Sequence, residues 1–153
     1  MTYDSREETL AHQERVDWLL QPVLAELEER AERHDESKLY SPEKETYDKF
    51  TPKLEQSTYG SDEYKQFLVD MGPALQHHYE HNRHHPEHFG DAGINGMTLI
   101  DLMEMLADWK AATERHADGD LVRSFEIQAN RFDISPQLLQ ILQNTADHLG
   151  WLD

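Results

Sequence analysis

The sequence has no cysteine among its 153 residues, and no apolar run approaches the roughly 20 residues that span a bilayer. Without cysteine, disulfides and thiolate metal sites are excluded, so any bound metal must take nitrogen and oxygen ligands. The first ten residues have neither the basic stretch nor the apolar stretch of a secretory signal. We therefore expect a cytoplasmic protein with no membrane partner.

Positive charge is also scarce. Only 14 Lys and Arg stand against 31 Asp and Glu, which gives a formal net charge of −17. Such a chain repels the phosphate backbone of nucleic acids and the surface of anionic membranes, so a long nucleic acid is not an expected partner. A small phosphorylated substrate is compatible with this charge if metal ions and a few basic side chains neutralise it locally.

Helical periods dominate the sequence, and no segment alternates in β-branched residues as a strand would. The sequence therefore predicts an all-α fold, with residues 1–153 forming a single helical domain. Capping residues indicate where helices start. These starts are Ser5, Ser41-Pro42, Ser61 or Asp62, Thr98, Leu121 and Ser135-Pro136.

Prolines and glycines predict where helices break. A break near Leu20-Gln21 would start a new helix at Pro22, Thr51-Pro52 would end a helix near residue 50, and Gly72-Pro73 would interrupt a third helix. The stretch from residue 86 to 96 holds three glycines and is expected to be a loop. The helix capped by Thr98 is expected to run to about Ala117, followed by a turn at residues 118–120.

Histidine is the residue type in excess: the chain has ten, and six lie within the twelve residues from His77 to His88. Helical spacing brings several of them onto one face, and Pro86 ends the helix so that the last ones can turn into a pocket. We expect His77 and His88 to be solvated or hydrogen-bonded. The residues expected to include metal ligands are His78, His81, His84 and His85.

A second candidate metal feature is the pair His34-Asp35, at the predicted end of a helix. Adjacent helical residues diverge by about 100°, so joint chelation requires a frayed helix end. The break near residue 21 matters as well, because His12 could share an ion with His34 only if the chain folds back there. One continuous helix would separate His12 from His34 by about 33 Å. Neutral imidazoles and carboxylates suit Zn, Mn, Fe, Co or Ni.

The candidate residues follow one another in the order His12, then His34-Asp35 in the run HDESK, then Asp108 in the run MLADWKAA. This order resembles the HD-domain superfamily of helical metal phosphohydrolases. The runs RHDESKL, HHYEHNRHHPEHF and MTLIDLMEMLADWKAA are similar to a small HD-like family of phages and bacteria. The resemblance implies an HD-domain-like helical bundle that holds one or two divalent transition-metal ions. It makes His12, His34, Asp35 and Asp108 the core ligands. Many helical HD proteins assemble, so a homo-oligomer is compatible with it.

The function that these features predict is hydrolysis of a small phosphate ester, with a nucleotide or deoxynucleotide as the expected substrate. Lys38 and Arg83 would offset charge in the transition state, and Glu87 could donate a proton to the leaving group. Two alternatives stay open. One is an HD-fold diiron oxygenase, whose ligand list is the same. The other is a non-catalytic phage accessory protein that binds a nucleotide or a host protein.

Overall fold

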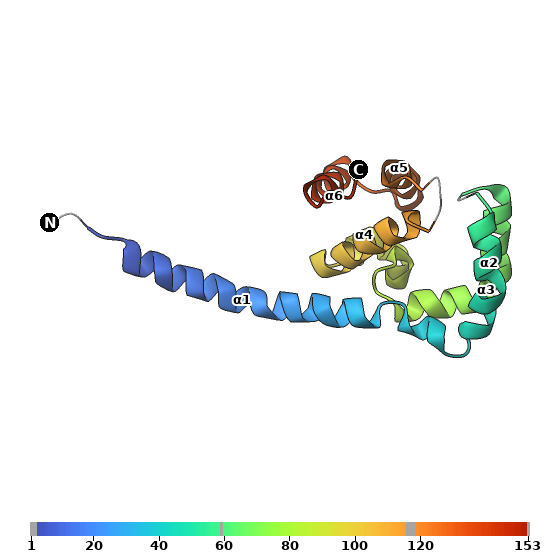
Figure 1. The fold of residues 1–153 in the computed structure, drawn as a ribbon, viewed down its shortest axis with the longest axis horizontal. Helices are drawn as coiled ribbons and strands as arrows, with labels where there is room; N and C mark the ends of the chain where they lie inside the picture. Colours follow the sequence, from blue (N-terminus) through green and yellow to red (C-terminus); the bar gives the residue numbers. More distant parts are fainter. Residues whose placement is uncertain (1–2, 59, 116–118, 153) are drawn as a thin grey trace. The chain divides into compact units, whose positions relative to one another are not determined.

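The computed structural model describes residues 3–58, 60–115 and 119–152. Over these ranges the chain forms helices joined by turns and has no strand, which confirms the all-α prediction (Figure 1). The elements are α1 (Arg6–Arg33), η1 (Glu36–Leu39), α2 (Lys44–Gln56), α3 (Asp62–His81), η2 (Pro86–Gly96), α4 (Leu99–Thr113), α5 (Leu121–Phe132) and α6 (Pro136–His148).

The chain divides into two parts, Met1–His34 and Asp35–Asp153, where the sequence predicts a single domain. The first part consists mainly of α1, which runs through Pro22 without interruption (Figure 1). The predicted break near Leu20-Gln21 is therefore wrong. Proline inside a helix costs about 3 kcal/mol, but strong helix formers on both sides and ion pairs such as Arg30–Glu26 favour continuation.

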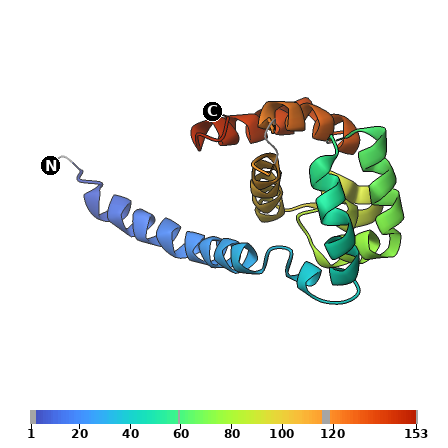
Figure 2. The same ribbon diagram turned by 45° about the vertical axis from the view of Figure 1, so that its right-hand side comes forward.

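In the second part, α2 packs against α3, and Figure 2 shows the two helices side by side. The helix α2 continues through Pro52 to Gln56, so the predicted end near residue 50 is wrong. Phe50, which is buried, lies with its ring centroid 6.2 Å from that of Phe67 on α3. This packing favours the helical state over the interruption that Pro52 would otherwise cause.

Two local predictions for α3 are confirmed, whereas the helix ends at His81 and not at Pro86. The hydroxyl of Ser61 caps the helix by accepting a hydrogen bond from the backbone N–H of Tyr64 at 3.1 Å. The helix kinks at Gly72, whose φ of +34° lies in the region that favours glycine, so the predicted interruption is confirmed. The predicted loop at residues 86–96 is a series of 3₁₀ turns, with positive φ at Gly90 and Gly93.

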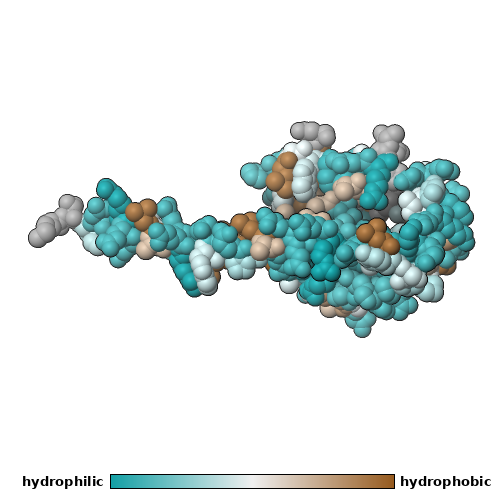
Figure 3. All heavy atoms as spheres, turned by 60° about the horizontal axis from the view of Figure 1, so that its bottom comes forward, coloured by the Kyte–Doolittle hydropathy of each residue, from teal (hydrophilic) through white to brown (hydrophobic). Residues whose placement is uncertain are grey.

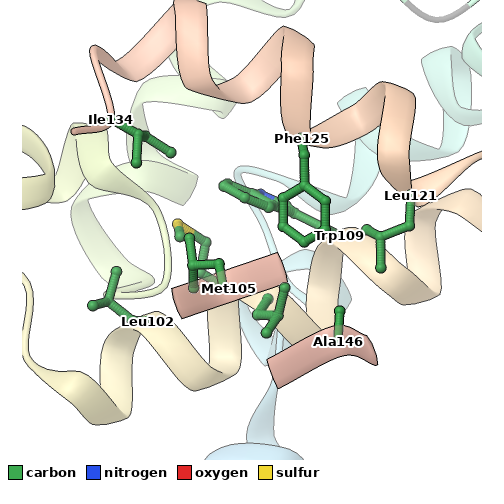
Figure 4. Packing of buried hydrophobic residues seen from close by; sticks show 9 residues of the cluster. Leu102, Met105, Trp109, Leu121, Phe125, Ile134 and Ala146 are labelled. Carbon is green, nitrogen blue, oxygen red and sulfur yellow. The ribbon is translucent and has the colours of Figure 1, made fainter. Parts of the chain in front are cut away.

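The apolar interior is formed by α4, α5 and α6 (Figure 4). Thr98 opens α4 with a capping box, and the ring of Trp109 meets Phe125 edge-on with centroids 6.2 Å apart. The helix α4 ends at Thr113, so the predicted end near residue 117 is wrong, and the predicted turn from Asp118 begins outside the described residues. The buried side chains of this interior are Leu102, Met105, Leu106, Trp109, Leu121, Phe125, Ile134, Leu142 and Ala146.

The face drawn in Figure 3 is mainly hydrophilic, with hydrophobic residues as scattered spots. Among the residues that the structure describes, none of the helices combines the length and the apolar character needed to cross a membrane.

Candidate metal centre

Four side chains from separate segments of the second part bring ligand atoms to one place. Asp35 precedes η1, His78 lies on α3, and His84 and His85 lie between α3 and η2. One ligand atom from each residue lies within 4.8 Å of those of the other three. We call these four residues the His–Asp group.

The spacing within the His–Asp group fits a metal ion. Nε2 of His78 lies 3.2 Å from Oδ1 of Asp35 and 2.9 Å from Nε2 of His85. Nε2 of His84 lies 3.4 Å from the same Asp35 oxygen. Ligands held about 2.1 Å from a tetrahedral ion are themselves about 3.4 Å apart. Three imidazoles and one carboxylate can therefore hold one transition-metal ion.

The position of Asp35 follows from how α1 ends. The helix stops at Arg33, His34 is its C-cap, and Asp35 takes a left-handed conformation with φ of +58°. Aspartate is one of the few residues with a β-carbon that adopts this conformation readily. The backbone then enters η1, where the Lys38 N–H donates to the Asp35 carbonyl at 2.9 Å. The frayed helix end that the sequence predicts at this pair is confirmed.

Two carboxylates fix the orientation of two of the imidazoles. Nδ1 of His78 lies 2.9 Å from Glu43, and Nδ1 of His84 lies 3.1 Å from Glu104. A carboxylate only accepts hydrogen bonds, so each Nδ1 carries the proton and each Nε2 keeps a lone pair. Both lone pairs face the Asp35 carboxylate, which is itself an acceptor. A cation satisfies all of these acceptors together, as in metal sites where a carboxylate orients a histidine ligand.

The local charge also favours a cation. Four carboxyl groups, those of Asp35, Glu43, Glu104 and Asp108, lie within or beside the group. The facing ammonium is that of Lys38, whose Nζ lies 2.5 Å from Oδ2 of Asp35. A divalent ion would bring this environment close to neutrality.

The surroundings shift the pKa values of two groups. Burial of Glu43 raises its pKa, but hydrogen bonds from His77 and Ser37 and the neighbouring His78 outweigh burial, so the pKa lies below its usual value. Burial, together with His84 and His78, lowers the pKa of His85 to about 2. His85 is therefore a neutral imidazole, the form that binds metals.

The other histidines of the cluster lie elsewhere. His81 is exposed, its Nδ1 donates to the carbonyl of His77 at 2.8 Å, and its ring stacks on the His77 ring. The structure does not bring it to the His–Asp group. His77 bonds Glu43 at 2.7 Å, and Nδ1 of His88 donates to the carbonyl of Tyr79 at 3.0 Å. The expectation that His77 and His88 are hydrogen-bonding residues is confirmed.

His12 lies on α1, which runs without interruption to Arg33, and His34 caps that helix 22 residues after His12. At 1.5 Å per residue the two are about 33 Å apart along the helix axis. The prediction that they share an ion is wrong, because the break that would have folded them together is absent.

Asp108 and Lys38 lie beside the His–Asp group, and neither is one of its four members. Asp108 is on α4, with a carboxylate oxygen within 4.8 Å of a ring nitrogen of His84. Lys38 forms the ion pair with Asp35, and its ammonium lies 4.8 Å from the ring centroid of Tyr47.

Arg83 and Glu87 form ion pairs with other residues. The guanidinium of Arg83 donates to both oxygens of the buried Asp101, at 3.1 and 3.0 Å. The guanidinium that we expected to offset charge in the transition state thus binds a carboxylate of the chain itself. Glu87 accepts from Arg131 on α5 at 2.5 Å, which ties η2 to that helix.

The role of Glu43 was missed from the sequence. It directly follows a serine-proline helix start, where an acidic residue is usually explained by the positive end of the helix dipole. Glu104 had a usable signal, because Asp101, Glu104 and Asp108 share one face of α4 at spacings of three and seven. Asn82 was also missed; its amide donates to the hydroxyl of Ser37 at 2.8 Å.

With this geometry described, the chain can be compared with known proteins. The model of a family of unknown function, DUF5662, matches residues 1–148. The chain belongs to that family. No curated protein and no solved structure matches it. Because the description of DUF5662 gives no activity, the function must be argued from the His–Asp group.

Proposed function

We propose that this DUF5662 protein binds a divalent transition-metal ion at the His–Asp group and hydrolyses a small phosphate ester, with nucleotides as the expected substrates. The observation that carries the proposal is the convergence of three Nε2 atoms and one Asp35 oxygen. The reaction class comes from the resemblance of the sequence to the HD-domain superfamily.

The residues of the group have distinct parts in such a reaction. A bound divalent ion would supply a hydroxide near neutral pH and polarise the phosphoryl oxygen. Asp35 would hold the ion through Oδ1 while Oδ2 keeps its ion pair with Lys38. The Lys38 side chain is 28% exposed, so its ammonium is accessible to a phosphate oxygen of the substrate.

The number of ligands restricts the choice of ion. Three imidazoles and one carboxylate complete a tetrahedral zinc shell, and a catalytic site needs an open position. Ions that accept six ligands, such as Mn²⁺ or Fe²⁺, keep two positions open with the same four residues. We therefore propose that hydrolysis is supported by a six-coordinate ion.

The same number of protein ligands, four, favours a second candidate function. A zinc ion saturated by four protein ligands would be structural and would stabilise residues 35–153 without catalysis. The two candidates differ in which ion supports activity, so they can be separated by experiment.

The test uses the full chain, stripped of metal and reloaded with Mn²⁺, Co²⁺, Ni²⁺ or Zn²⁺. Phosphate release is then measured across a panel of nucleotides. We expect release with six-coordinate ions and a loss of at least about 100-fold in Asp35→Asn and His84→Ala, whose side chains contribute ligand atoms. His81→Ala is the matched control and should keep its activity.

Each other outcome is informative. Stoichiometric metal binding without phosphate release, strongest for Zn²⁺, would contradict the hydrolase and support the structural ion. Failure of the wild-type chain to bind any of the four ions would contradict both candidates. His34→Ala tests the HD resemblance separately, because the resemblance makes His34 a ligand.

A further inference from the structure

Glu43 lies beside the His–Asp group and contacts two adjacent histidines of the cluster. Its side chain is fully buried, and its two oxygens are shared between two adjacent imidazoles. Oε1 lies 2.7 Å from Nδ1 of His77, and Oε2 lies 2.9 Å from Nδ1 of His78. The hydroxyl of Ser37 donates to Oε2 at 3.0 Å.

The backbone around Glu43 is held as firmly as its side chain. Its N–H donates to the carbonyl of Tyr40 at 3.1 Å, and its own carbonyl accepts from Thr46 and Tyr47 at the start of α2. The amide of Asn82 donates to Ser37 at 2.8 Å, so the Ser37 proton is directed to Glu43. This carboxylate therefore has a fixed position and receives three hydrogen bonds.

We infer that Glu43 is the positioning residue of the metal centre: by holding Nδ1 of His78, it directs the Nε2 lone pair of that imidazole at the ion. The inference rests on the proposed metal site. Glu43 does not touch the ion or a substrate. It acts through His78, while His77, which is one-third exposed, occupies its second oxygen.

Loss of the carboxylate has a defined consequence. An amide at this position has one oxygen to accept a hydrogen bond and an NH₂ group that repels a second Nδ1–H. With Glu43→Gln, only one of the two imidazoles can keep its present tautomer. Partners of metal-bound histidines typically contribute about 10–100-fold to metal affinity.

The experiment measures Co²⁺ affinity by competition with a chelator, together with the visible absorption spectrum of the bound cobalt. In Glu43→Gln we expect affinity to fall about 10–100-fold and the spectrum to change, because His77 and His78 then compete for the single amide oxygen and the His78 ring is no longer held in one orientation. His77→Ala should keep affinity within about threefold of wild type, since the His78 hydrogen bond survives. Glu87→Gln, at a carboxylate paired with Arg131, is the matched control and should not change either quantity.

The failures of the two proposals are distinguishable. If the wild-type chain binds no Co²⁺, the proposed metal site is wrong. If wild type binds and Glu43→Gln is folded, binds equally well and shows the same spectrum, only the role of Glu43 is overturned. Should Glu43→Gln not fold, Glu43→Asp decides: its shorter carboxylate does not reach Nδ1 of His78, and unchanged affinity and spectrum there would also overturn the inference.

Discussion

The second part of the chain has two interiors of opposite chemistry, and α4 contributes to both. One side of α4 carries Met105, Leu106 and Trp109 into the apolar interior. Another side carries Asp101 and Glu104 to Arg83 and His84. A single helix thus separates a region held by apolar contacts from a region built of imidazoles and carboxylates.

The two interiors should respond differently to metal ions and to pH. Apolar burial stabilises the fold whatever ions are present. The polar interior gathers several carboxyl groups and three imidazoles, and burying such groups is costly unless their charges are compensated. Its stability should therefore depend on metal and on pH, whereas that of the apolar interior should not.

The largest effect is expected in the apolar interior. Phe125 is 1% exposed, so Phe125→Ala leaves a cavity and should lower the free energy of unfolding by about 3–5 kcal/mol. Urea unfolding of the metal-free protein measures this change. Val122→Ala, at an exposed position of the same helix, should cost less than about 0.5 kcal/mol. Similar losses in the two variants would contradict the placement of the apolar interior.

The next effect belongs to the polar interior. Metal at about 100 times its dissociation constant should raise the free energy of unfolding by about 2.7 kcal/mol. The gain should vanish in Asp35→Asn and His84→Ala and persist in His81→Ala. Thermal unfolding with and without metal measures it. An equal gain in all four proteins would place the ion elsewhere.

The pH dependence of the metal-free protein sharpens the comparison. The folded chain keeps His85 neutral down to a pKa of about 2, whereas an unfolded chain protonates it near pH 6.5. Below pH 6.5 the unfolded state binds the extra proton, so stability falls as pH falls, by at most about 1.4 kcal/mol per pH unit. Urea midpoints between pH 7 and 5 measure this slope. A slope unchanged in His85→Asn would contradict the assignment.

The smallest effect concerns the ion pair that joins the two interiors. Arg131 and Glu87 are 40% and 27% exposed, so Arg131→Gln should cost no more than about 1 kcal/mol. Metal affinity should stay at the wild-type value. A calorimetric melting scan and a metal titration check both expectations, and a loss of metal binding would show that the ion pair holds the His–Asp group together.

Sequence reasoning succeeded at most local features, although Ser5 forms no side-chain cap and α2 begins at Lys44, later than the start predicted at Ser41-Pro42. Ser61, Thr98 and Ser135 cap helices with hydrogen bonds to residues three positions away, and Gly72 kinks α3 by its own backbone conformation. Such features depend on a few neighbouring residues. The breaks predicted at Pro22 and Pro52 are wrong. Helix-forming neighbours outweigh the cost of the proline at Pro22, and tertiary packing outweighs it at Pro52.

The membership of the metal group depended on contacts between distant segments. Helical spacing could not separate His81 from His84, because the chain leaves the helix after His81 and turns before η2. Nothing near Glu43 in the sequence indicates that its side chain will meet His78, 35 residues later. That contact exists because α2 packs against α3, which a single sequence does not reveal.

The central claim is that Asp35, His78, His84 and His85 hold one ion, and anomalous diffraction tests it most directly. Crystals of the chain grown with Mn²⁺ or Co²⁺ would be measured on both sides of the absorption edge of the metal. We expect one anomalous peak about 2.0–2.3 Å from Oδ1 of Asp35 and from the Nε2 atoms of the three histidines. A peak at other residues, or no peak in crystals saturated with metal, would contradict the account.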